Sequence, residues 1–401
     1  MYQRQSKDIT TLLSEQAHCF LLKVLKRCLP LNLGGYKLGE DLFWSVLLLA
    51  SVTQTTIEAV CQQLSGTISG NRFREHLAAQ LADERMSVED LEERLRAVLQ
   101  GGLPKKVKQQ LSRQAWEVAG DWVEIPYYGK VAEDDKWVRR SAAKAGTTHF
   151  NCYASLTIIY RRHRYTIALT LVRRGEAMVE VTKRLIEQVR KLRLRLKLML
   201  LDKAFGVIEV MRYLRRRRIA YIIALARRGG AGGISKLCEG RRSYQTTHRF
   251  ESAKAGRLKT AVVVVCKYSK LNYRKPGVRY FCYAINGLGV VKAGTVFIRY
   301  RRRFAIESGY RQLHQTRART ASRQTRVRLL LIGLAMLIVN VYVLLRRAAI
   351  KVGRNGERQR RMKLTLADLR EELKRFISQK FGAKCKIHCC DLDLYRSFVN
   401  Y

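Results

Sequence analysis

The chain has 401 residues and carries 78 Lys and Arg against 32 Asp and Glu, a formal net charge of +46 at pH 7. This length exceeds one compact core, and the 47% hydrophobic content can fill several, which excludes a disordered polycation. So dense a positive charge requires a polyanionic partner. Nucleic acid is favoured over an acidic membrane surface because many phosphates can be neutralised at once.

The N-terminus, MYQRQSKDIT, is polar and charged, with no apolar stretch leading to a small-residue cleavage site. It therefore predicts no secretory signal. Ten cysteines are scattered without a spaced framework, which is typical of reduced thiols. Together these features predict a cytoplasmic protein associated with the nucleoid.

Residues 1–110 are predicted to be helical and to form an N-terminal DNA-binding domain. Residues 55–64 have apolar side chains at helical spacing and are followed by the turn SGTISG. A second helix then begins behind Asn71 and carries Arg72 and Arg74 in its first turn. This pattern resembles a helix-turn-helix, whose second helix can enter a major groove. The same spacing also occurs in helical hairpins that bind nothing.

Beyond a Gly-Gly-Leu-Pro break, the pattern of the chain changes from helices to strands. Three strand-like runs cover residues 115–127, 149–162 and 163–174, and the last two predict a hairpin. Helix, strand, helix and strand then alternate up to residue 226. This order predicts an α/β fold with a mixed sheet covered by helices, and it matches a ribonuclease-H-like core.

The alternation stops after residue 226, and three strand-like runs with polar turns predict a β-rich insertion over residues 227–295. The catalytic core is therefore predicted to combine residues 111–226 with residues 296–350. Residues 351–401 are predicted to form a basic, helical C-terminal region. Within it, Cys385, His388, Cys389 and Cys390 have the chemistry of metal ligands but no second pair at zinc-site spacing, so ordinary thiols are favoured.

The longest apolar run extends from Leu329 to Leu345 and is interrupted by Gly333 and Asn340. A membrane-spanning helix usually needs about twenty apolar residues. A helix buried in a large α/β core has the same composition, and we favour this interpretation because no second hydrophobic segment accompanies the run.

Two isolated aspartates are placed where strands carry ligand sites. Asp121 lies in the strand-like run GDWVEIPYYGK, and Asp202 ends the apolar run of residues 198–201, as expected of a strand buried on both faces. Acidic side chains at the ends of such strands line the crevice where α/β proteins bind ligands. The alternative for each aspartate is a helix cap or a surface ion pair.

A helix near residue 300 is predicted to place several polar side chains on one face. Tyr300, Arg303, Glu307, then Tyr310 or Arg311, and His314 follow one another at helical spacing. A solvated helix with ordinary ion pairs is the simpler interpretation. However, the stretch RYRRR has more positive charge than one glutamate neutralises, and a phosphodiester would supply the rest.

This stretch resembles the DDE transposases of bacterial and archaeal insertion sequences, in the insertion-sequence-four-like group. The family pattern is Tyr, two residues, Arg, three residues, Glu, six residues and Lys. Tyr300, Arg303 and Glu307 match it, whereas His314 stands at the lysine position. The motifs around Asp121 and Asp202 and the asparagine in the apolar run also match. The resemblance extends from about residue 110 to residue 345.

The resemblance implies that Asp121, Asp202 and Glu307 bind two Mg²⁺ or Mn²⁺ ions. The same site would catalyse hydrolysis at the ends of the element and then transfer of the cut strand into target DNA. Arg303 would clamp phosphate, and Tyr300 would contact the DNA backbone or a displaced base. A protonated His314 or the neighbouring Arg317 would replace the lysine.

The implied function is cut-and-paste transposition of an insertion sequence. A homodimer would bind double-stranded DNA, at the terminal inverted repeats and at the target site. No membrane is expected as a partner. The alternatives are a metal-dependent nuclease with the same core and a non-catalytic basic DNA-binding protein.

Overall fold

The computed structural model describes two compact units of the chain. The helical unit comprises residues 1–87, 315–335 and 362–401, and the sheet unit comprises residues 88–314 and 336–361. The described residues are 2–33, 38–82, 84–160, 163–227, 233–268, 278–349 and 364–383. Side chains are described for these residues except 2–13, 278, 304–311 and 347–349. The cluster from Cys385 to Cys390 lies outside the described residues.

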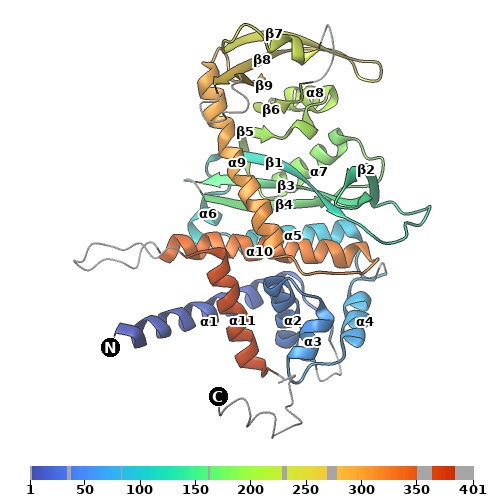
Figure 1. The fold of residues 1–401 in the computed structure, drawn as a ribbon, viewed down its shortest axis with the longest axis vertical. Helices are drawn as coiled ribbons and strands as arrows, with labels where there is room; N and C mark the ends of the chain where they lie inside the picture. The colour runs from blue at the N-terminus through green and yellow to red at the C-terminus, as the bar shows by residue number, and fades with distance from the viewer. Residues whose placement is uncertain are drawn as a thin grey trace, which may run out of the picture. The chain divides into compact units, whose positions relative to one another are not determined.

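The helical unit confirms that the N-terminal part of the chain is helical. Its helices are α1 (Tyr2–Cys28), α2 (Glu40–Thr53), α3 (Ile57–Gln63), α4 (Gly70–Gln80), α11 (Leu366–Phe381) and the first part of α10 (Thr325–Ala349). The apolar helix α2 is buried along almost its whole length. Phe43 of α2 stacks on Phe73 of α4, with ring centroids 4.6 Å apart. The core of this unit therefore forms around α2 (Figure 1).

Helices α3 and α4 form the predicted pair of helices joined by a turn. The Thr56 hydroxyl caps α3 by accepting a hydrogen bond from the Ala59 amide. Helix α4 begins at Gly70, slightly earlier than predicted, because Ser69 rather than Asn71 supplies its cap. Arg72 is exposed on this helix and available to a partner.

His18 of α1 is buried in the helical unit against aromatic side chains of α11. Its ring centroid lies 5.2 Å from that of Phe376 and 6.4 Å from that of Phe381. Its Nε2 atom lies 2.9 Å from the Ser45 hydroxyl. Burial first, and then the positive charge of Lys380, lower the pKa of His18 to about 4, although Asp41 acts in the opposite direction.

Acidification is expected to destabilise the folded chain through His18. The unfolded chain takes up this proton near the ordinary histidine pKa of 6.5, whereas the folded chain takes it up only near 4. The free energy of unfolding should therefore fall by up to about 3 kcal/mol as the pH drops through this window. Urea denaturation across the window measures the effect, and His18→Leu should remove it. An identical pH dependence in the variant and the wild type would contradict the assignment.

The sheet unit contains one nine-stranded mixed sheet with the order β2-β3-β1-β5-β6-β9-β8-β7, and β4 pairs with β3. The strands are β1 (Ala115–Pro126), β2 (Val138–Lys144), β3 (Thr147–Tyr160), β4 (His163–Leu171), β5 (Arg195–Leu201), β6 (Tyr221–Leu225), β7 (Tyr244–Ser252), β8 (Gly256–Tyr268) and β9 (Val278–Asn286). The helices are α5 (Val88–Gly101), α6 (Lys105–Gln110), α7 (Met178–Lys191), α8 (Ile208–Arg216), α9 (Ala293–Gln315) and the second part of α10, with short 3₁₀ turns η1 (Lys203–Phe205) and η2 (Ile234–Leu237).

The central strands are buried on both faces, as the apolar run before Asp202 predicts. Strand β5 is parallel to β1 and to β6, and alternate residues of these strands face opposite helices. Leu198 and Leu200 pack in the cluster that includes Tyr300 of α9. Met199 and Leu201 pack in the cluster that includes residues of α7 and α8. Helices therefore cover both faces of the sheet, with α9 on one of them (Figure 1).

Four further strands, β2 and β7 to β9, extend the sheet beyond the strands predicted for the catalytic core. Strand β2 was not predicted, because its sequence VRRSAAK is polar and mostly exposed and has no apolar alternation. Strands β7, β8 and β9 correspond to the predicted β-rich insertion, and β9 pairs antiparallel with β6. These three strands therefore continue the central sheet rather than forming a sheet of their own.

The apolar run lies in α10, and its burial fits the core interpretation. Among the described residues, α10 is long and apolar enough to cross a membrane, and 78% of its apolar window is buried inside the protein. Helices α2 and α3 pass the same test only as a pair bent by 112°. The Asn340 side chain of α10 accepts a hydrogen bond from the Thr166 amide of β4 and donates one to the Thr166 carbonyl, at 2.9 and 2.8 Å.

Replacing Asn340 by leucine is expected to lower the free energy of unfolding by about 2–4 kcal/mol. The amide and the carbonyl of Thr166 would both lose their buried partner. Urea denaturation measures the loss. The neighbouring change Val339→Leu exchanges one apolar side chain for another and should cost less than about 1.5 kcal/mol. Equal stabilities of the two variants would show that the paired hydrogen bonds contribute nothing.

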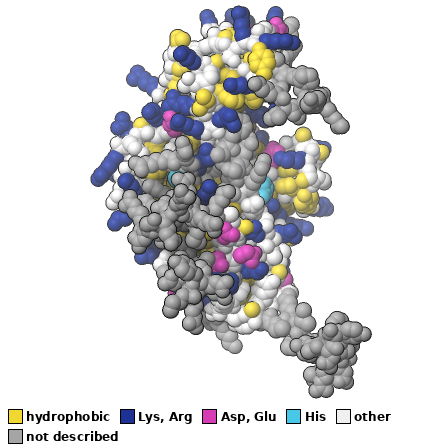
Figure 2. Space-filling model, turned by 60° about the vertical axis from the view of Figure 1, so that its left-hand side comes forward, with side chains coloured by type: hydrophobic (Ala, Val, Ile, Leu, Met, Phe, Trp, Pro, Cys, Tyr) yellow, Lys and Arg dark blue, Asp and Glu magenta, His cyan; other side chains and the backbone are white. Residues whose placement is uncertain are grey.

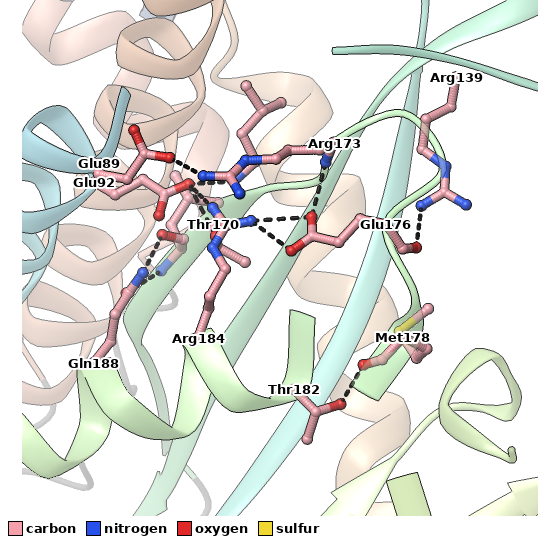
Figure 3. A network of polar contacts seen from close by, with 12 residues as sticks. Glu89, Glu92, Arg139, Thr170, Arg173, Glu176, Met178, Thr182, Arg184 and Gln188 are labelled. Atoms are coloured by element: carbon pink, nitrogen blue, oxygen red, sulfur yellow. Dashed lines mark hydrogen bonds and ion pairs between the residues drawn. The ribbon is translucent and has the colours of Figure 1, made fainter. Parts of the chain in front are cut away.

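A buried ion network joins α5, β4 and α7 in the sheet unit (Figure 3). The Glu92 carboxylate of α5 accepts hydrogen bonds from the Thr170 hydroxyl at 2.9 Å, the Leu171 amide at 2.8 Å and the Arg184 guanidinium at 2.7 Å. Arg184 also contacts Glu176 at 2.9 Å. Burial raises the pKa of Glu92, although Arg184 and the hydrogen bonds act in the opposite direction. The network thus ties the helices on one side of the sheet to β4.

Candidate active site

The site begins with two aspartates on neighbouring parallel strands. Gly120 of β1 pairs with Leu201 of β5, so the residues that follow them, Asp121 and Asp202, lie side by side at the carboxyl end of β5. A Cβ atom at position 120 would lie 2.5 Å from the end of the Leu201 side chain, which would have to shift, so the glycine leaves room for that side chain. Asp202 directly follows the end of β5, as expected, whereas Asp121 lies within β1, level with the end of β5.

Arg303 of α9 connects the two aspartates. Its Nη1 atom lies 3.3 Å from Oδ1 of Asp121, and its Nη2 atom lies 3.2 Å from Oδ1 of Asp202. The same carboxylate oxygens accept hydrogen bonds from backbone amides, those of Trp122 at 2.8 Å and Lys203 at 2.6 Å. Three elements distant in sequence therefore meet at one guanidinium group.

Tyr300 holds Arg303 in this position. Its hydroxyl donates a hydrogen bond to the Leu201 carbonyl at 3.2 Å and accepts one from Nε of Arg303 at 2.8 Å. Its ring packs against that of Tyr283 in β9, with centroids 4.7 Å apart. Both Tyr300 and Arg303 are almost completely buried. Tyr300 therefore attaches α9 to the end of β5, rather than standing exposed towards a DNA backbone.

Burial shapes the charges of the site. It raises the pKa of Asp121 to about 6, and Asp202 adds to this rise while Arg303 opposes it. Burial would lower the pKa of Arg303, but Tyr300, Asp121 and Asp202 outweigh it and raise that pKa, so Arg303 stays charged. A carboxyl group whose pKa is raised on folding destabilises the folded chain once it ionises, a cost that is typical of functional sites.

The aspartates open into a cleft of about 650 Å³. Tyr280, Phe281 and Tyr283 of β9 form an aromatic part of its lining. Basic groups also line it, namely Lys144, Lys203, Arg227, Arg303 and His314. Lys and Arg side chains are spread over the described surface that Figure 2 shows, and Asp and Glu side chains are fewer. The cleft therefore suits a polyanion with planar ring groups, which can stack on the aromatic side chains while the basic groups contact its negative charges.

The remaining predicted site residues are not all placed with the cleft. Helix α9 carries Glu307 and Arg311, but their side chains lie outside the described ones. Arg317 belongs to the helical unit, as do Arg72 and Arg74. Arg74 contacts its own helix through the Gly70 carbonyl, at 3.1 Å.

The described side chains include no group of three His, Cys, Asp or Glu that could hold a metal ion. The two aspartates nevertheless fit a metal. Their carboxylates converge on one cation, Arg303, and supply the hard oxygen ligands that Mg²⁺ and Mn²⁺ prefer. They would be two members of a ligand set whose third predicted member is Glu307.

The aromatic residues of β9 were not predicted to belong to the site. Tyr283 reaches it because β9 pairs with β6, where Tyr283 lies opposite Ala224. No local pattern in the sequence indicates this pairing. Lys203 could have been found from the sequence, since it directly follows Asp202.

Comparisons with known proteins identify a family and a similar fold. A family model described as "Transposase DDE domain" matches residues 113–340. Among solved structures, the chain is similar to the cryo-EM structure of the piggyBac transposase synaptic complex with hairpin DNA, with a TM-score of 0.51 and 10% sequence identity. The similarity covers 89% of this chain and 74% of that chain, and at this identity it shows the fold alone. No curated protein matches the chain.

Proposed function

Because the chain belongs to the transposase DDE domain family, we propose that it is a cut-and-paste transposase that hydrolyses DNA at the ends of an insertion sequence and joins them to a target. The observation that carries the proposal is the convergence of Asp121 and Asp202 on Arg303 within a basic cleft. Acids that meet at one edge of a sheet, in a chain of net charge +46, suit a phosphodiester substrate.

The sheet supports a ribonuclease-H-like core. Strand β3 pairs antiparallel with both β1 and β4, and β1 pairs in parallel with β5, which pairs in parallel with β6. The sequence predicts a similar order for such a core, with three strands followed by alternating helix and strand. We propose that β7–β9 are an addition to it that supplies the aromatic wall of the cleft.

Asp121, Asp202 and Glu307 would hold two Mg²⁺ or Mn²⁺ ions. When bound, the ions activate the attacking hydroxyl and stabilise the leaving oxygen of an in-line displacement. Arg303 keeps the two aspartates together, and Tyr300 keeps Arg303 in place. The basic groups on the cleft lining, including His314 at the family's lysine position, would hold the phosphates of the substrate.

The partner would be double-stranded DNA, with a homodimer holding two ends. The solved structure to which the chain is similar is a transposase synaptic complex with hairpin DNA. Helix α4, with Arg72 exposed, is the candidate for contact with the inverted repeats, and Arg74, Arg311 and Arg317 are further candidates for phosphate contact.

The proposal is tested with the purified chain and a DNA duplex that carries the inverted repeats flanking its reading frame. We expect cleavage at the repeat ends in Mg²⁺, none in EDTA, and joining to a supercoiled target. Cleavage without joining would favour a nuclease with the same core. Binding without cleavage in Mg²⁺ or Mn²⁺ would overturn the proposal and favour a non-catalytic DNA-binding protein.

A further inference from the structure

Arg303 occupies the position between Asp121 and Asp202 where a cation is needed. Each of its terminal nitrogens contacts a different carboxylate, at 3.3 and 3.2 Å. Arg303 is 4% exposed, so this positive charge is not shared with solvent. Two neighbouring carboxylates repel each other strongly where water is scarce, and a guanidinium group between them relieves that repulsion.

The surroundings of Arg303 hold it for this contact. Its Nε atom donates to the Tyr300 hydroxyl at 2.8 Å, which points the two terminal nitrogens at the aspartates. Tyr300 is held in turn by the Leu201 carbonyl and by the Tyr283 ring. A planar fork of donors can contact two carboxylates at once, whereas a lysine ammonium would act as a single point charge.

We propose that Arg303 is a resident counter-cation of the two aspartates, which it holds together before metal arrives and for which it competes with the metal. The inference rests on the proposed function, in which the aspartates are metal ligands. The two carboxylates that contact Arg303 are also the groups whose negative charge would attract a divalent ion, so the guanidinium and the metal compete for them. The displaced guanidinium is then available to a DNA phosphate, the other anion that its fork fits.

This competition has a measurable consequence for metal affinity. Metal binding must weaken the ion pair of Arg303 with Asp121 or its charged hydrogen bond with Asp202, and charged contacts of this kind are among the stronger polar contacts in proteins. Removing the guanidinium should therefore tighten metal binding rather than weaken it. A residue that assisted metal binding or served only the core would give the opposite sign or no change.

The test measures Mn²⁺ binding to the full chain without DNA, through the electron paramagnetic resonance signal of the free ion. We compare wild type with Arg303→Gln, and with Tyr300→Phe, which keeps the buried ring but removes the hydroxyl that holds Nε. The control is Arg302→Gln, which removes the same charge one residue away from a side chain that contacts Glu117 instead. A variant with both Asp121→Asn and Asp202→Asn gives the background binding.

We expect Arg303→Gln to bind Mn²⁺ about tenfold more tightly than wild type and Tyr300→Phe to bind it a few-fold more tightly. Arg302→Gln should bind it as wild type does. In EDTA, the thermal midpoint of Arg303→Gln should lie below that of wild type, and saturating Mn²⁺ should raise it by more than it raises the wild-type midpoint.

Equal or weaker Mn²⁺ affinity in both Arg303→Gln and Tyr300→Phe would overturn the inference. If wild type still cleaves DNA in Mg²⁺, the proposed function survives that result. Wild type that neither binds Mn²⁺ above background nor cleaves DNA would overturn both. Tyr300→Phe keeps the inference testable if Arg303→Gln fails to fold.

Discussion

Asp121→Asn and Asp202→Asn are each expected to slow Mg²⁺-dependent DNA cleavage by at least about 1,000-fold. Metal ions contribute several kcal/mol to such displacements, and each 1.4 kcal/mol corresponds to about a tenfold change in rate. Asparagine keeps the size of the side chain and an oxygen that can still accept the hydrogen bond from the backbone amide. It removes the negative charge that attracts a divalent ion. Single-turnover cleavage of labelled inverted-repeat DNA measures the rate.

Glu117 provides a matched control for this comparison. It lies on β1 as Asp121 does, and its carboxylate contacts the arginines Arg299 and Arg302 of α9. It does not line the described part of the cleft. Glu117→Gln should therefore cleave DNA within a few-fold of wild type. If Glu117→Gln is as slow as the aspartate variants, the defect reflects loss of β1–α9 packing, and the assignment of Asp121 and Asp202 as metal ligands fails.

Glu92→Leu is expected to lower the free energy of unfolding by about 3–5 kcal/mol. The change leaves Arg184, the Thr170 hydroxyl and the Leu171 amide without the carboxylate that they share. Breaking a buried ion pair by removing one partner is costly, because the other charge stays buried without compensation. Urea denaturation followed by circular dichroism measures the loss.

The neighbouring Glu93 shows how much of that effect depends on burial. Its side chain is 54% exposed and contacts Lys191 at 2.7 Å. Glu93→Leu should cost less than about 1 kcal/mol, as is usual for exposed ion pairs. Replacing both Glu92 and Arg184 by leucine should recover part of the stability lost in Glu92→Leu. A Glu92→Leu variant as stable as Glu93→Leu would show that the buried network adds nothing to the fold.

Local patterns in the sequence were sufficient to predict most of the elements that hold the site. The apolar run before Asp202 predicts a strand buried on both faces, and the structure has β5 there. The helical spacing of Tyr300 and Arg303 predicts that they share a face, and their side chains are hydrogen-bonded. Such patterns succeed because strand and helix periodicities depend on neighbours in the chain.

The roles of the same residues depended on distant contacts. Tyr300 and Arg303 are both buried beside the aspartates, a placement that the sequence did not indicate. Nothing in the stretch around residue 300 indicates which strand ends it will meet, because those strands are about 100 to 180 residues earlier in the chain. Strand β2 was missed for a related reason, since its pairing with β3 rather than its own polar composition makes it a strand.

Taken alone, the amino-acid sequence predicts a polyanionic partner, most of the order of helices and strands, and two isolated aspartates in strand-like runs, since charge and periodicity are local properties. Only the tertiary structure shows that β1 pairs with β5, that β9 extends the sheet, and that Arg303 lies between Asp121 and Asp202. Those features arise from contacts between segments far apart in the chain, whose geometry is set by packing of the whole sheet unit.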